Sequence, residues 1–320
     1  MPIHFSVIIP NYNHAPFLQQ RIDSILNQTW QYFEVIILDD ASEDNSKKII
    51  ESYRNHEKVK AIEYNQMNSG APSLQWKKGI GLAENEWVWI AESDDYAAPS
   101  YLQEAAKSIE ANPDLAIFYS DGYIVDKMGN YLAQTFSLKK NRDFNMAKWS
   151  NPYVAEGIDE INECMKFDCT INNVSGIVFR KTLFDTDVQD LYQFKYYGDW
   201  YFGLLACFRG KVSYSPKPLN YYRKHADSHL NKKTSIVTSR SEYFKILALM
   251  FYRADVTNKK DLLDHFVFYY LNFGLFQDGW INAAKIVSQY IKFDPSLAFK
   301  VIWRIFKFRI SHKKPKISFS

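Results

Sequence analysis

Phe5-Ser-Val-Ile-Ile-Pro-Asn-Tyr-Asn13 begins with a short β-branched run that stops at a proline and an asparagine. A run of this kind, bounded by turn-forming residues, predicts a buried strand over Phe5–Ile9. Pro16 suits the first turn of a following helix. That helix has one apolar face, formed by Phe17, Leu18, Ile22, Ile25 and Leu26. The opening stretch is therefore a strand followed by an amphipathic helix.

The same alternation continues to about residue 120. Further strands are predicted over Phe33–Leu38, Val59–Tyr64, Trp87–Ala91 and Leu115–Ser120. Helices are predicted between them: one capped by Ser42 and Asp44 and reaching about Asn55, one following the loop Asn65–Ser73 and ending near Ala83, and one from Pro99 to just before Asn112. Consecutive strand–helix units with short links predict an α/β fold, a mainly parallel twisted sheet with helices on both faces.

The pattern loosens after Tyr123. Strands are predicted over Val174–Phe179, Lys211–Ser215 and Leu219–Tyr222, with a helix over Asp199–Arg209 that Gly210 closes. From about residue 234 the apolar residues recur at helical spacing. We therefore divide the chain into a first α/β half (1–122), a second half of the same domain (123–233) and a C-terminal helical extension (234–320).

Composition excludes several classes of protein. The chain is 47% hydrophobic with a formal net charge of only +3, which gives no reason to expect a nucleic-acid partner. Three cysteines form neither a zinc spacing nor a disulfide framework. The longest apolar runs, such as Ile246–Tyr252, fall short of the roughly 18 residues that a membrane span needs. A cytoplasmic location is expected.

Acidic residues follow two strands of the predicted sheet. Asp39 and Asp40 end the second strand, and Glu92, Asp94 and Asp95 follow the fourth. Ligands bind beyond the carboxyl ends of strands in open parallel sheets, and a hard divalent cation reconciles close carboxylates. The alternative is a turn at Asp39–Asp40 and a helix cap at Asp95. Three carboxylates within four residues favour a site for a cation and a phosphate-bearing substrate.

Other enzymes with an acidic rim fit less well. A receiver or haloacid-type phosphatase needs Ser/Thr and Lys after its later strands, where this chain has acids. The glycine patterns of dehydrogenases and P-loop proteins are absent. A sugar nucleotidyltransferase would carry a Gly-rich, basic loop after the first strand, in place of Asn11-Tyr12-Asn13-His14. A protein that only binds its ligand, without turnover, would be expected to lose the acidic cluster, which this chain keeps.

Taken in order, several motifs resemble those of family 2 glycosyltransferases. They are Ser6-Val-Ile-Ile-Pro-Asn-Tyr-Asn13, Ser24-Ile-Leu-Asn-Gln-Thr29, Phe33-Glu-Val-Ile-Ile-Leu-Asp-Asp40, Trp89-Ile-Ala-Glu-Ser-Asp-Asp-Tyr96, Gly198-Asp-Trp200 and Leu219-Asn-Tyr-Tyr-Arg-Lys-His225. The resemblance covers about residues 3–230. It implies a GT-A fold, an inverting mechanism, a nucleoside-diphosphate sugar donor and Mg²⁺ or Mn²⁺.

The resemblance also implies roles for individual residues. Tyr12 would stack on the base of the donor, Asp40 would accept a hydrogen bond from it, and Asp39 would support the pocket. Asp199 would be the general base, although an Asp at this position is also a good helix N-cap. The donor-binding set is Pro10, Tyr12, Asp39, Asp40, Asn68 and Asp94. The metal set is Asp94, Asp95 and His225.

Two departures from the family pattern weaken the transfer of roles. Gln75-Trp76-Lys77 stands where the family often has Ala-Arg-Asn, and the longer Glu92 replaces the first acid of Asp-x-Asp. The Gln-x-x-Arg-Trp motif of processive synthases is also absent, which favours transfer of a single sugar. We expect a UDP- or dTDP-linked donor and a hydroxyl of a glycan or lipid-linked acceptor, in cell-surface polysaccharide biosynthesis.

The C-terminal segment Pro295–Ser320 has seven basic residues and no acidic one. Large apolar residues interleave with the basic ones, a mixture suited to a membrane interface. Two interpretations remain open: the segment docks on an anionic membrane surface, or it forms a last helix that packs on the body and leaves a solvated basic end.

Overall fold

The computed structural model describes residues 1–133, 135–171, 173–184, 191, 194–225, 235–273 and 280–311. Its strands are β1 Phe5–Asn11, β2 Phe33–Asp39, β3 Val59–Tyr64, β4 Trp87–Ile90, β5 Tyr96–Ala97, β6 Leu115–Val125, β7 Tyr131–Ala133, β8 Tyr153–Glu156, β9 Ile177–Arg180 and β10 Lys211–Arg223. Its α-helices are α1 Ala15–Leu26, α2 Ser46–Ser52, α3 Pro72–Leu82, α4 Tyr101–Ala111, α5 Phe136–Asp143, α6 Gly157–Glu160, α7 Gly198–Cys207, α8 Ile236–Phe251, α9 Lys259–Phe273, α10 Trp280–Phe293 and α11 Pro295–Ser311.

One sheet contains all of these strands, in the order β3-β2-β1-β4-β9-β6-β10-β5, with β7 on β6 and β8 on β10. β1 to β4 pair in parallel, as do β6 and β10. β9 is antiparallel to both of its neighbours, β4 and β6. The predicted mainly parallel sheet is therefore confirmed, and β6 crosses the predicted boundary at residue 122, so both halves share the sheet.

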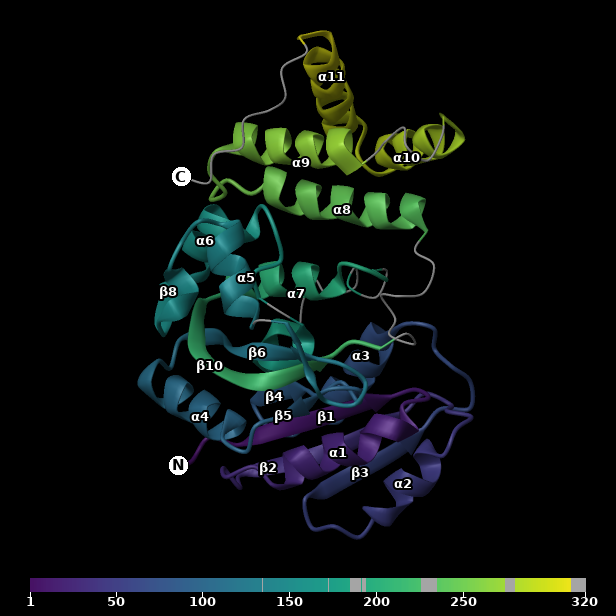
Figure 1. Cartoon of the computed structure of the whole chain (residues 1–320), viewed down its shortest axis with the longest axis vertical. Helices are drawn as coiled ribbons and strands as arrows, with labels where there is room; N and C mark the ends of the chain where they lie inside the picture. Colours follow the sequence, from purple (N-terminus) through teal and green to yellow (C-terminus); the bar gives the residue numbers. More distant parts are fainter. Residues whose placement is uncertain are drawn as a thin grey trace.

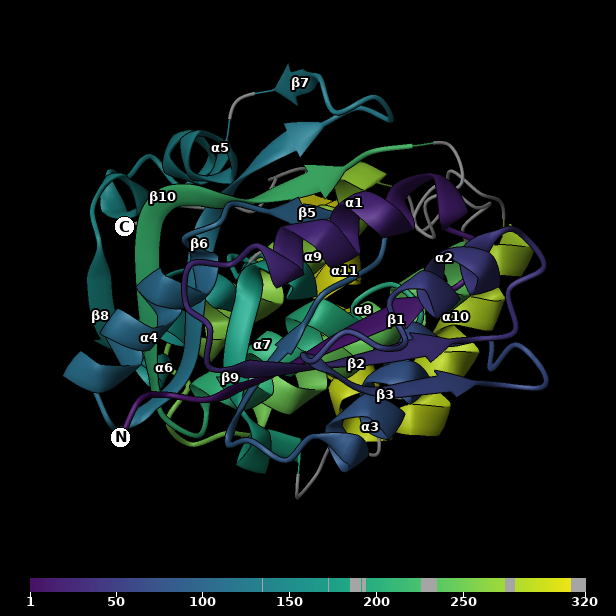
Figure 2. The same cartoon turned by 90° about the horizontal axis from the view of Figure 1, so that it is seen from below.

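Helices cover both faces of the sheet because β1 buries alternate residues on opposite sides. Phe5, Val7 and Ile9 pack with α1, α2 and α4 in one core. Ile8 packs with α3, α7 and the C-terminal helices in the other. Figure 2 shows α1 and α2 on one side of β1 and β2, with α3 on the other. This confirms the expected helices on both faces.

The C-terminal helices α8 to α11 form a layer beyond α7, at the end of the molecule opposite β3 (Figure 1). α8 packs against α9 and α10, and α11 packs against α9 and α10. The expected helical extension is confirmed. In the part of the chain that the structure describes, none of these helices is long and apolar enough to cross a membrane.

Several local expectations were wrong. The predicted strand over Val174–Phe179 starts with a 3₁₀ turn, Val174–Gly176, before β9. The two strands predicted around Pro216 and Pro218 are the single strand β10, which accommodates the prolines at shifts in its register with β6. Neither Ser42 nor Asp44 is the N-cap of α2, which is Asn45 without a side-chain bond. Asp44 instead accepts hydrogen bonds from the Ser46 and Ala15 amides.

Candidate active site

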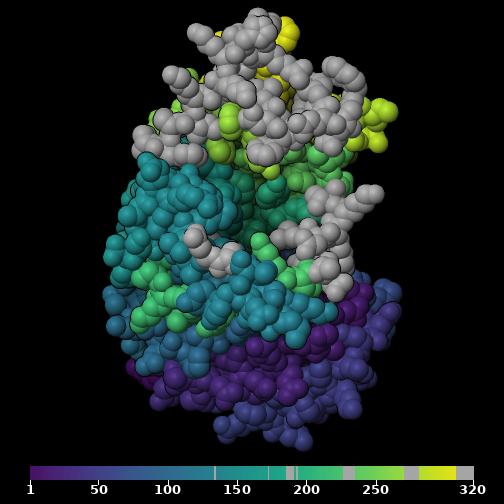
Figure 3. All heavy atoms as spheres, in the orientation of Figure 1, coloured from purple at the N-terminus to yellow at the C-terminus, as the bar shows by residue number. Residues whose placement is uncertain are grey.

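A cleft of about 580 Å³ opens at the carboxyl ends of β1, β2 and β4. Its walls come from the ends of these strands, from the loop that leads into α3, and from the residues that precede and begin α7. Figure 3 shows the molecule hollowed at mid-height, between the sheet below and the C-terminal helices above. Asp40 and the Glu92–Asp95 group line this same cleft, which confirms that the two acidic groups converge.

The two aspartates at the end of β2 have different surroundings. Asp39 is buried and does not line the cleft. Its carboxylate accepts hydrogen bonds from Asn11 Nδ2 at 2.8 Å and from the Ser42 amide at 2.9 Å. Asn11 does line the cleft, and Asp39 therefore supports a residue of the wall.

Asp40 lines the cleft and anchors the loop that leads into α3. Its carboxylate accepts hydrogen bonds from Asn65 Nδ2 at 2.6 Å, from Ser69 Oγ at 2.7 Å and from Gln75 Nε2 at 2.8 Å. The Ser69 amide donates to both of its oxygens at 3.0 Å. Gln75, which departs from the family pattern, thus has a defined partner. The Asp40 carboxylate thus binds both ends of the loop, through Asn65 and Ser69.

Pro10, Tyr12 and Asn68 also line this side of the cleft. Tyr12 is 37% exposed, so its ring is open to a ligand. Asn68 Oδ1 accepts a hydrogen bond from the amide of Gly70, whose φ of 76° is a left-handed conformation that glycine adopts without strain. The structure therefore brings together every sequence-predicted donor residue except Asp39, which lies behind the wall.

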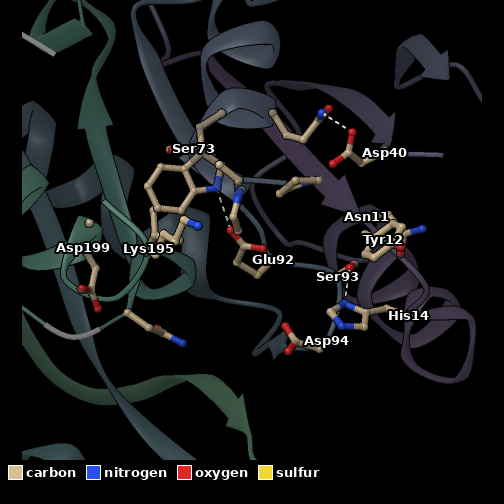
Figure 4. Close-up of a pocket in the computed structure, with 18 of the residues that line it drawn as sticks. Asn11, Tyr12, His14, Asp40, Ser73, Glu92, Ser93, Asp94, Lys195 and Asp199 are labelled. Atoms are coloured by element: carbon tan, nitrogen blue, oxygen red, sulfur yellow. Dashed lines mark hydrogen bonds between the residues drawn. The ribbon is translucent and has the colours of Figure 1, made fainter. Parts of the chain in front are cut away.

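Glu92 points into the cleft and accepts a hydrogen bond from Trp76 Nε1 at 2.7 Å (Figure 4). Burial and the neighbouring charge of Asp94 raise the pKa of the Glu92 carboxyl to about 8. The two departures noted in the sequence are therefore coupled, because Trp76 holds the longer acid in place.

Asp94 lies beside two histidines, His14 and His225. One ligand atom from each of the three residues falls within 4.8 Å of the others. His225 Nε2 lies 3.1 Å from Asp94 Oδ2, and His14 Nδ1 lies 2.8 Å from Ser93 Oγ. Burial acts to raise the pKa of Asp94, but the hydrogen bond from His225 and the charges of both histidines outweigh it, and the pKa is lowered. One carboxylate and two imidazoles form a donor set that suits a divalent transition-metal ion.

Asp95, which the sequence assigned to the metal, has other partners. Its carboxylate accepts hydrogen bonds from the Arg223 amide at 2.9 Å and from Asn173 Nδ2 at 2.8 Å. Burial, followed by the charge of Asp94, raises the pKa of Asp95 to about 7. The structure thus brings His14 together with Asp94 and His225, while Asp95 lines the same cleft and has these other partners. His14 was missed because a single histidine in a loop carries little signal, although it follows the end of β1.

Arg21 was also missed. Its guanidinium is fully buried 4.9 Å from the ring of Trp89, and none of its nitrogens donates a hydrogen bond within the described structure. Burial lowers the pKa of Arg21 to about 10, while the charges of Asp95, Glu92 and Asp94 act to raise it. The residue places a positive charge beneath the acidic group. Its signal in the sequence is an arginine within the apolar stripe of α1.

Asp199 lies on the opposite wall, in the first turn of α7, and lines the cleft. The N-cap of α7 is Tyr197, so the interpretation of Asp199 as the cap is wrong. Burial raises the pKa of Asp199 to about 6, although a hydrogen bond from the Trp200 amide at 2.8 Å acts to lower it. Figure 4 shows Asp199 and Lys195 on the side of the cleft opposite Asp40 and Tyr12.

Comparisons with known proteins agree with this geometry. The structure resembles that of TarS from Staphylococcus aureus in complex with UDP-GlcNAc, with a TM-score of 0.67 and 20% identity over 90% of this chain and 79% of that one. A mannosyltransferase from Pyrobaculum calidifontis, in complex with GDP-Man and Mn²⁺, gives a TM-score of 0.59 and 14% identity over 98% of this chain and 84% of that one. The fold is therefore of the GT-A type.

Sequence relatives lead to the same family. An uncharacterised glycosyltransferase of Methanocaldococcus jannaschii is 30% identical over 40% of this chain and 45% of its own length. TarS, a poly(ribitol-phosphate) β-N-acetylglucosaminyltransferase, is 35% identical over 33% of this chain and 19% of its own length. The chain thus spans less than half the length of these two relatives. The family model for glycosyl transferase family 2 matches residues 6–169, and the chain belongs to that family.

Proposed function

We propose that this protein is an inverting glycosyltransferase that moves one sugar from a nucleoside-diphosphate donor to an acceptor hydroxyl with the help of a divalent metal. One observation supports this above all others. A single cleft has the Asp94 carboxylate beside two imidazoles on one side and the buried carboxylate of Asp199 on the other. The first arrangement suits a diphosphate with its cation, and the second suits proton removal from an alcohol.

The donor would occupy the half of the cleft built on β1, β2 and β4. Tyr12 would stack on the base, and Pro10 and Asn68 would line the nucleotide pocket. Asp40 would accept a hydrogen bond from the base while it holds the loop in place. In this division residues 1–122 would bind the nucleotide sugar and residues 123–233 the acceptor, with His225 of the second half reaching across to the cation ligands of the first.

Asp94, His14 and His225 would hold the cation. When bound, the cation neutralises the charge that develops on the leaving diphosphate. Two imidazole nitrogens among three ligands favour Mn²⁺ over Mg²⁺, which prefers an all-oxygen shell. Asp95 would support these ligands without binding the cation, because its carboxylate accepts hydrogen bonds both from Arg223 of β10 and from Asn173, which precedes the turn before β9.

Asp199 would take the proton of the acceptor hydroxyl. Its pKa of about 6 leaves it ionised at neutral pH while it remains a stronger base than an ordinary aspartate. Asp199 and the residues that would hold the cation lie on opposite walls, so the acceptor would approach the sugar from the side away from the diphosphate. This approach inverts the anomeric centre.

The acceptor would be a hydroxyl of a glycan or of a lipid-linked glycan, in cell-surface polysaccharide biosynthesis. TarS, the relative with a poly(ribitol-phosphate) acceptor, supports this class. Its complex with UDP-GlcNAc supports a uridine or thymidine diphosphate donor.

Incubation with a panel of nucleotide sugars and Mn²⁺ tests the proposal. Release of nucleoside diphosphate and formation of a product with inverted anomeric configuration would support it. Release of inorganic pyrophosphate from a nucleoside triphosphate and a sugar phosphate would instead identify a nucleotidyltransferase. Binding of donor without turnover, across a range of glycan acceptors, would identify a non-catalytic relative.

We also propose contact with an anionic membrane surface through α10 and α11. One side of α11 packs on the body, with Leu297, Ala298, Val301 and Ile305 buried. The other side, which we term the aromatic face, exposes Phe299 (70%), Trp303 (53%) and Phe306 (60%). One side of this helix thus packs on the body, and the membrane contact is proposed for the other side. Residues 312–320 of the basic segment lie outside the described structure.

The charges around the aromatic face suit anionic lipid. Lys292, Lys300 and Lys307 are exposed on α10 and α11. From Trp280 to Ser320 the sequence has nine lysines and arginines and one acid, Asp294. Each basic residue close to an anionic leaflet contributes about 1 kcal/mol, and exposed aromatic rings insert at the headgroup level. Such a surface would keep the enzyme near a lipid-linked acceptor, at the cytoplasmic face of the membrane.

A further inference from the structure

A carboxylate from the C-terminal extension binds three consecutive amides next to the catalytic cleft. Glu242 of α8 is only 3% exposed. Its Oε1 accepts a hydrogen bond from the Lys195 amide at 2.8 Å, and its Oε2 accepts from the amides of Tyr196 at 2.9 Å and Tyr197 at 3.2 Å. Successive amides that point at one anion form a concave binding site of the kind called a nest.

The three amides immediately precede α7, which begins at Gly198. The amino end of a helix carries a partial positive charge, and a carboxylate there makes stronger hydrogen bonds than a neutral acceptor. Glu242 therefore fixes both the path of this segment and the start of α7. It acts across a long sequence separation, from a part of the chain that follows the last strand of the sheet.

Other contacts from the same region support the segment. The Tyr197 ring stacks on the ring of Tyr243, with centroids 5.8 Å apart and an interplanar angle of 30°. The amide of Ser235, directly before α8, donates to Tyr196 Oη at 3.1 Å. Among these contacts, Glu242 supplies the charged group. It accepts hydrogen bonds from three backbone amides, which packing of the aromatic rings cannot satisfy.

The segment held by Glu242 forms the wall around the base. Lys195 and Tyr196 line the cleft, and Asp199 follows in the first turn of α7. Glu242 itself does not line the cleft. Glu242 therefore makes no direct contact with the cleft, and its contacts reach the cleft through the segment that it holds.

We propose that Glu242 is a positioning residue for the acceptor side of the active site, so that the C-terminal extension is a working part of the enzyme. The inference rests on the proposed function, in which Asp199 removes the acceptor proton. Without the carboxylate, Lys195–Tyr197 would lose its shared anchor and Asp199 its fixed distance to the acceptor. The donor side, built on β1, β2 and β4, makes no contact with Glu242 in the described structure.

The test compares Glu242→Gln with wild type in the full chain. Glutamine keeps the shape of the side chain, but it replaces one acceptor oxygen by an amide group that would face an N–H donor. We expect kcat to fall by about 10- to 100-fold, as follows a misplacement of about 1 Å, and KM for the acceptor to rise. KM for the donor, and UDP binding with Mn²⁺ measured by calorimetry, should stay within about twofold.

Two further variants complete the design. Ser241→Ala, one residue away on the same helix, should match wild type in both KM values. Glu242→Asp keeps the charge on a shorter side chain and should recover part of the loss in kcat. Wild-type kinetics in Glu242→Gln, or an equal loss of UDP binding and transfer, would overturn the inference.

Amide hydrogen exchange gives a readout that needs no turnover. The amides of Lys195, Tyr196 and Tyr197 should be protected in wild type and exchange at least about tenfold faster in Glu242→Asp and Glu242→Gln. Unprotected amides in wild type would show that Glu242 does not hold the segment. If wild type transfers no sugar from any donor, the proposed function fails, while the exchange data still decide the role of Glu242.

Discussion

Asp94 and Asp95 are adjacent in the sequence, yet their surroundings move their pKa values in opposite directions. Asp94 meets two histidines, and its pKa is lowered. Asp95 is buried against Asp94 with backbone and amide partners, and its pKa is raised to about 7. The first is suited to a cation, and the second to holding β10 against the site. Substitutions at the two positions should therefore have different effects.

Asp94→Asn should abolish metal-dependent donor binding and leave the fold intact. The change removes the charged ligand beside His14 and His225 at almost constant volume. Because loss of an outer-shell partner already costs about 10- to 100-fold in metal affinity, loss of the ligand itself should cost at least that much. Calorimetry with Mn²⁺ and UDP measures it.

Glu110→Gln, on the exposed side of α4, is the matched control and should bind like wild type. Unchanged Mn²⁺ dependence in Asp94→Asn would remove Asp94 from the metal site. Asp95→Ala is the poorer experiment, because it leaves the Arg223 amide and Asn173 without their acceptor and should lower the melting temperature.

Asp199→Asn should keep nucleotide binding and lose transfer by about 10²- to 10⁴-fold, since it removes the general base. The pH profile is a second measurement. A base with a pKa of about 6 is active when deprotonated, so wild-type kcat should rise with pH, reach half of its plateau near pH 6 and level off about one unit above that. That rise should be absent from the residual activity of Asp199→Asn. Transfer within a few-fold of wild type would place the base elsewhere.

The sequence could identify the residues that are acidic and also lie directly after a predicted strand or at the start of a predicted helix. Asp40, Asp94 and Asp199 follow strand ends or begin a helix, and all three line the cleft. His14 and Glu242 escaped prediction because their roles depend on long-range neighbours. No neighbouring residue distinguishes Glu242 from a solvated acid on a helix. The one indication in the sequence is its spacing of four residues from Ile246, which is buried on the same face of α8.

At the scale of elements, the strands that the sequence predicted are mostly buried on both faces, and the exception is the edge strand β3, where Lys60 and Glu63 are exposed. β1, β2, β3, β4 and β6 appear as apolar or β-branched runs, and the structure has all of them. The short strands β5, β7 and β8, of two to four residues, were missed because such runs have no measurable period. The antiparallel direction of β9 is a property of the sheet, and no pattern within the strand encodes it.

Two glycines of α3 make a matched pair for a packing prediction. A Cβ on Gly79 would lie 2.4 Å from Ile8 Cγ2, because α3 lies close against β1, whereas a Cβ on Gly81 meets nothing within 4 Å. Gly79→Ala should therefore destabilise the protein by about 1–3 kcal/mol through overpacking. Gly81→Ala should stabilise it by up to about 1 kcal/mol through helix propensity.

Chemical denaturation of both variants measures these changes in the free energy of unfolding. If Gly79→Ala has the same free energy of unfolding as Gly81→Ala, α3 does not pack against Ile8 of β1 as closely as the structure places it. Donor binding should follow the same order, because α3 carries Gln75, which bonds to Asp40.

At the scale of the whole molecule, the aromatic face predicts binding to anionic vesicles. Replacing Phe299, Trp303 and Phe306 by serine should reduce co-sedimentation with phosphatidylserine-containing vesicles by at least about tenfold. These point variants are better than truncation at Asp294, which would also remove the buried side of α11. Binding by wild type should weaken as salt rises and should be absent with phosphatidylcholine alone.

A charge pair of variants separates electrostatics from general surface effects. Vesicle binding should fall when three exposed lysines near the aromatic face are changed together to glutamine: Lys292, Lys300 and Lys307. Vesicle binding should not change when three exposed lysines of the sheet half are changed in the same way as a control: Lys48, Lys107 and Lys127. Equal binding by all variants would rule out the surface. Sedimentation as a dimer that the serine variant abolishes would show that a second copy covers the aromatic face instead.

The candidate ligands His14, Asp94 and His225 come from the first loop of the chain, from the end of β4 and from the residue pair that follows β10. During translation, the ribosome releases the first two long before the third. A nascent chain that ends in β6 thus has most of the nucleotide-facing wall but lacks one imidazole of the trio. Cation binding by all three ligands would then begin only after β10 has inserted beside β6, so Mn²⁺ affinity would report the insertion of β10 while α8 to α11 are still to be synthesised.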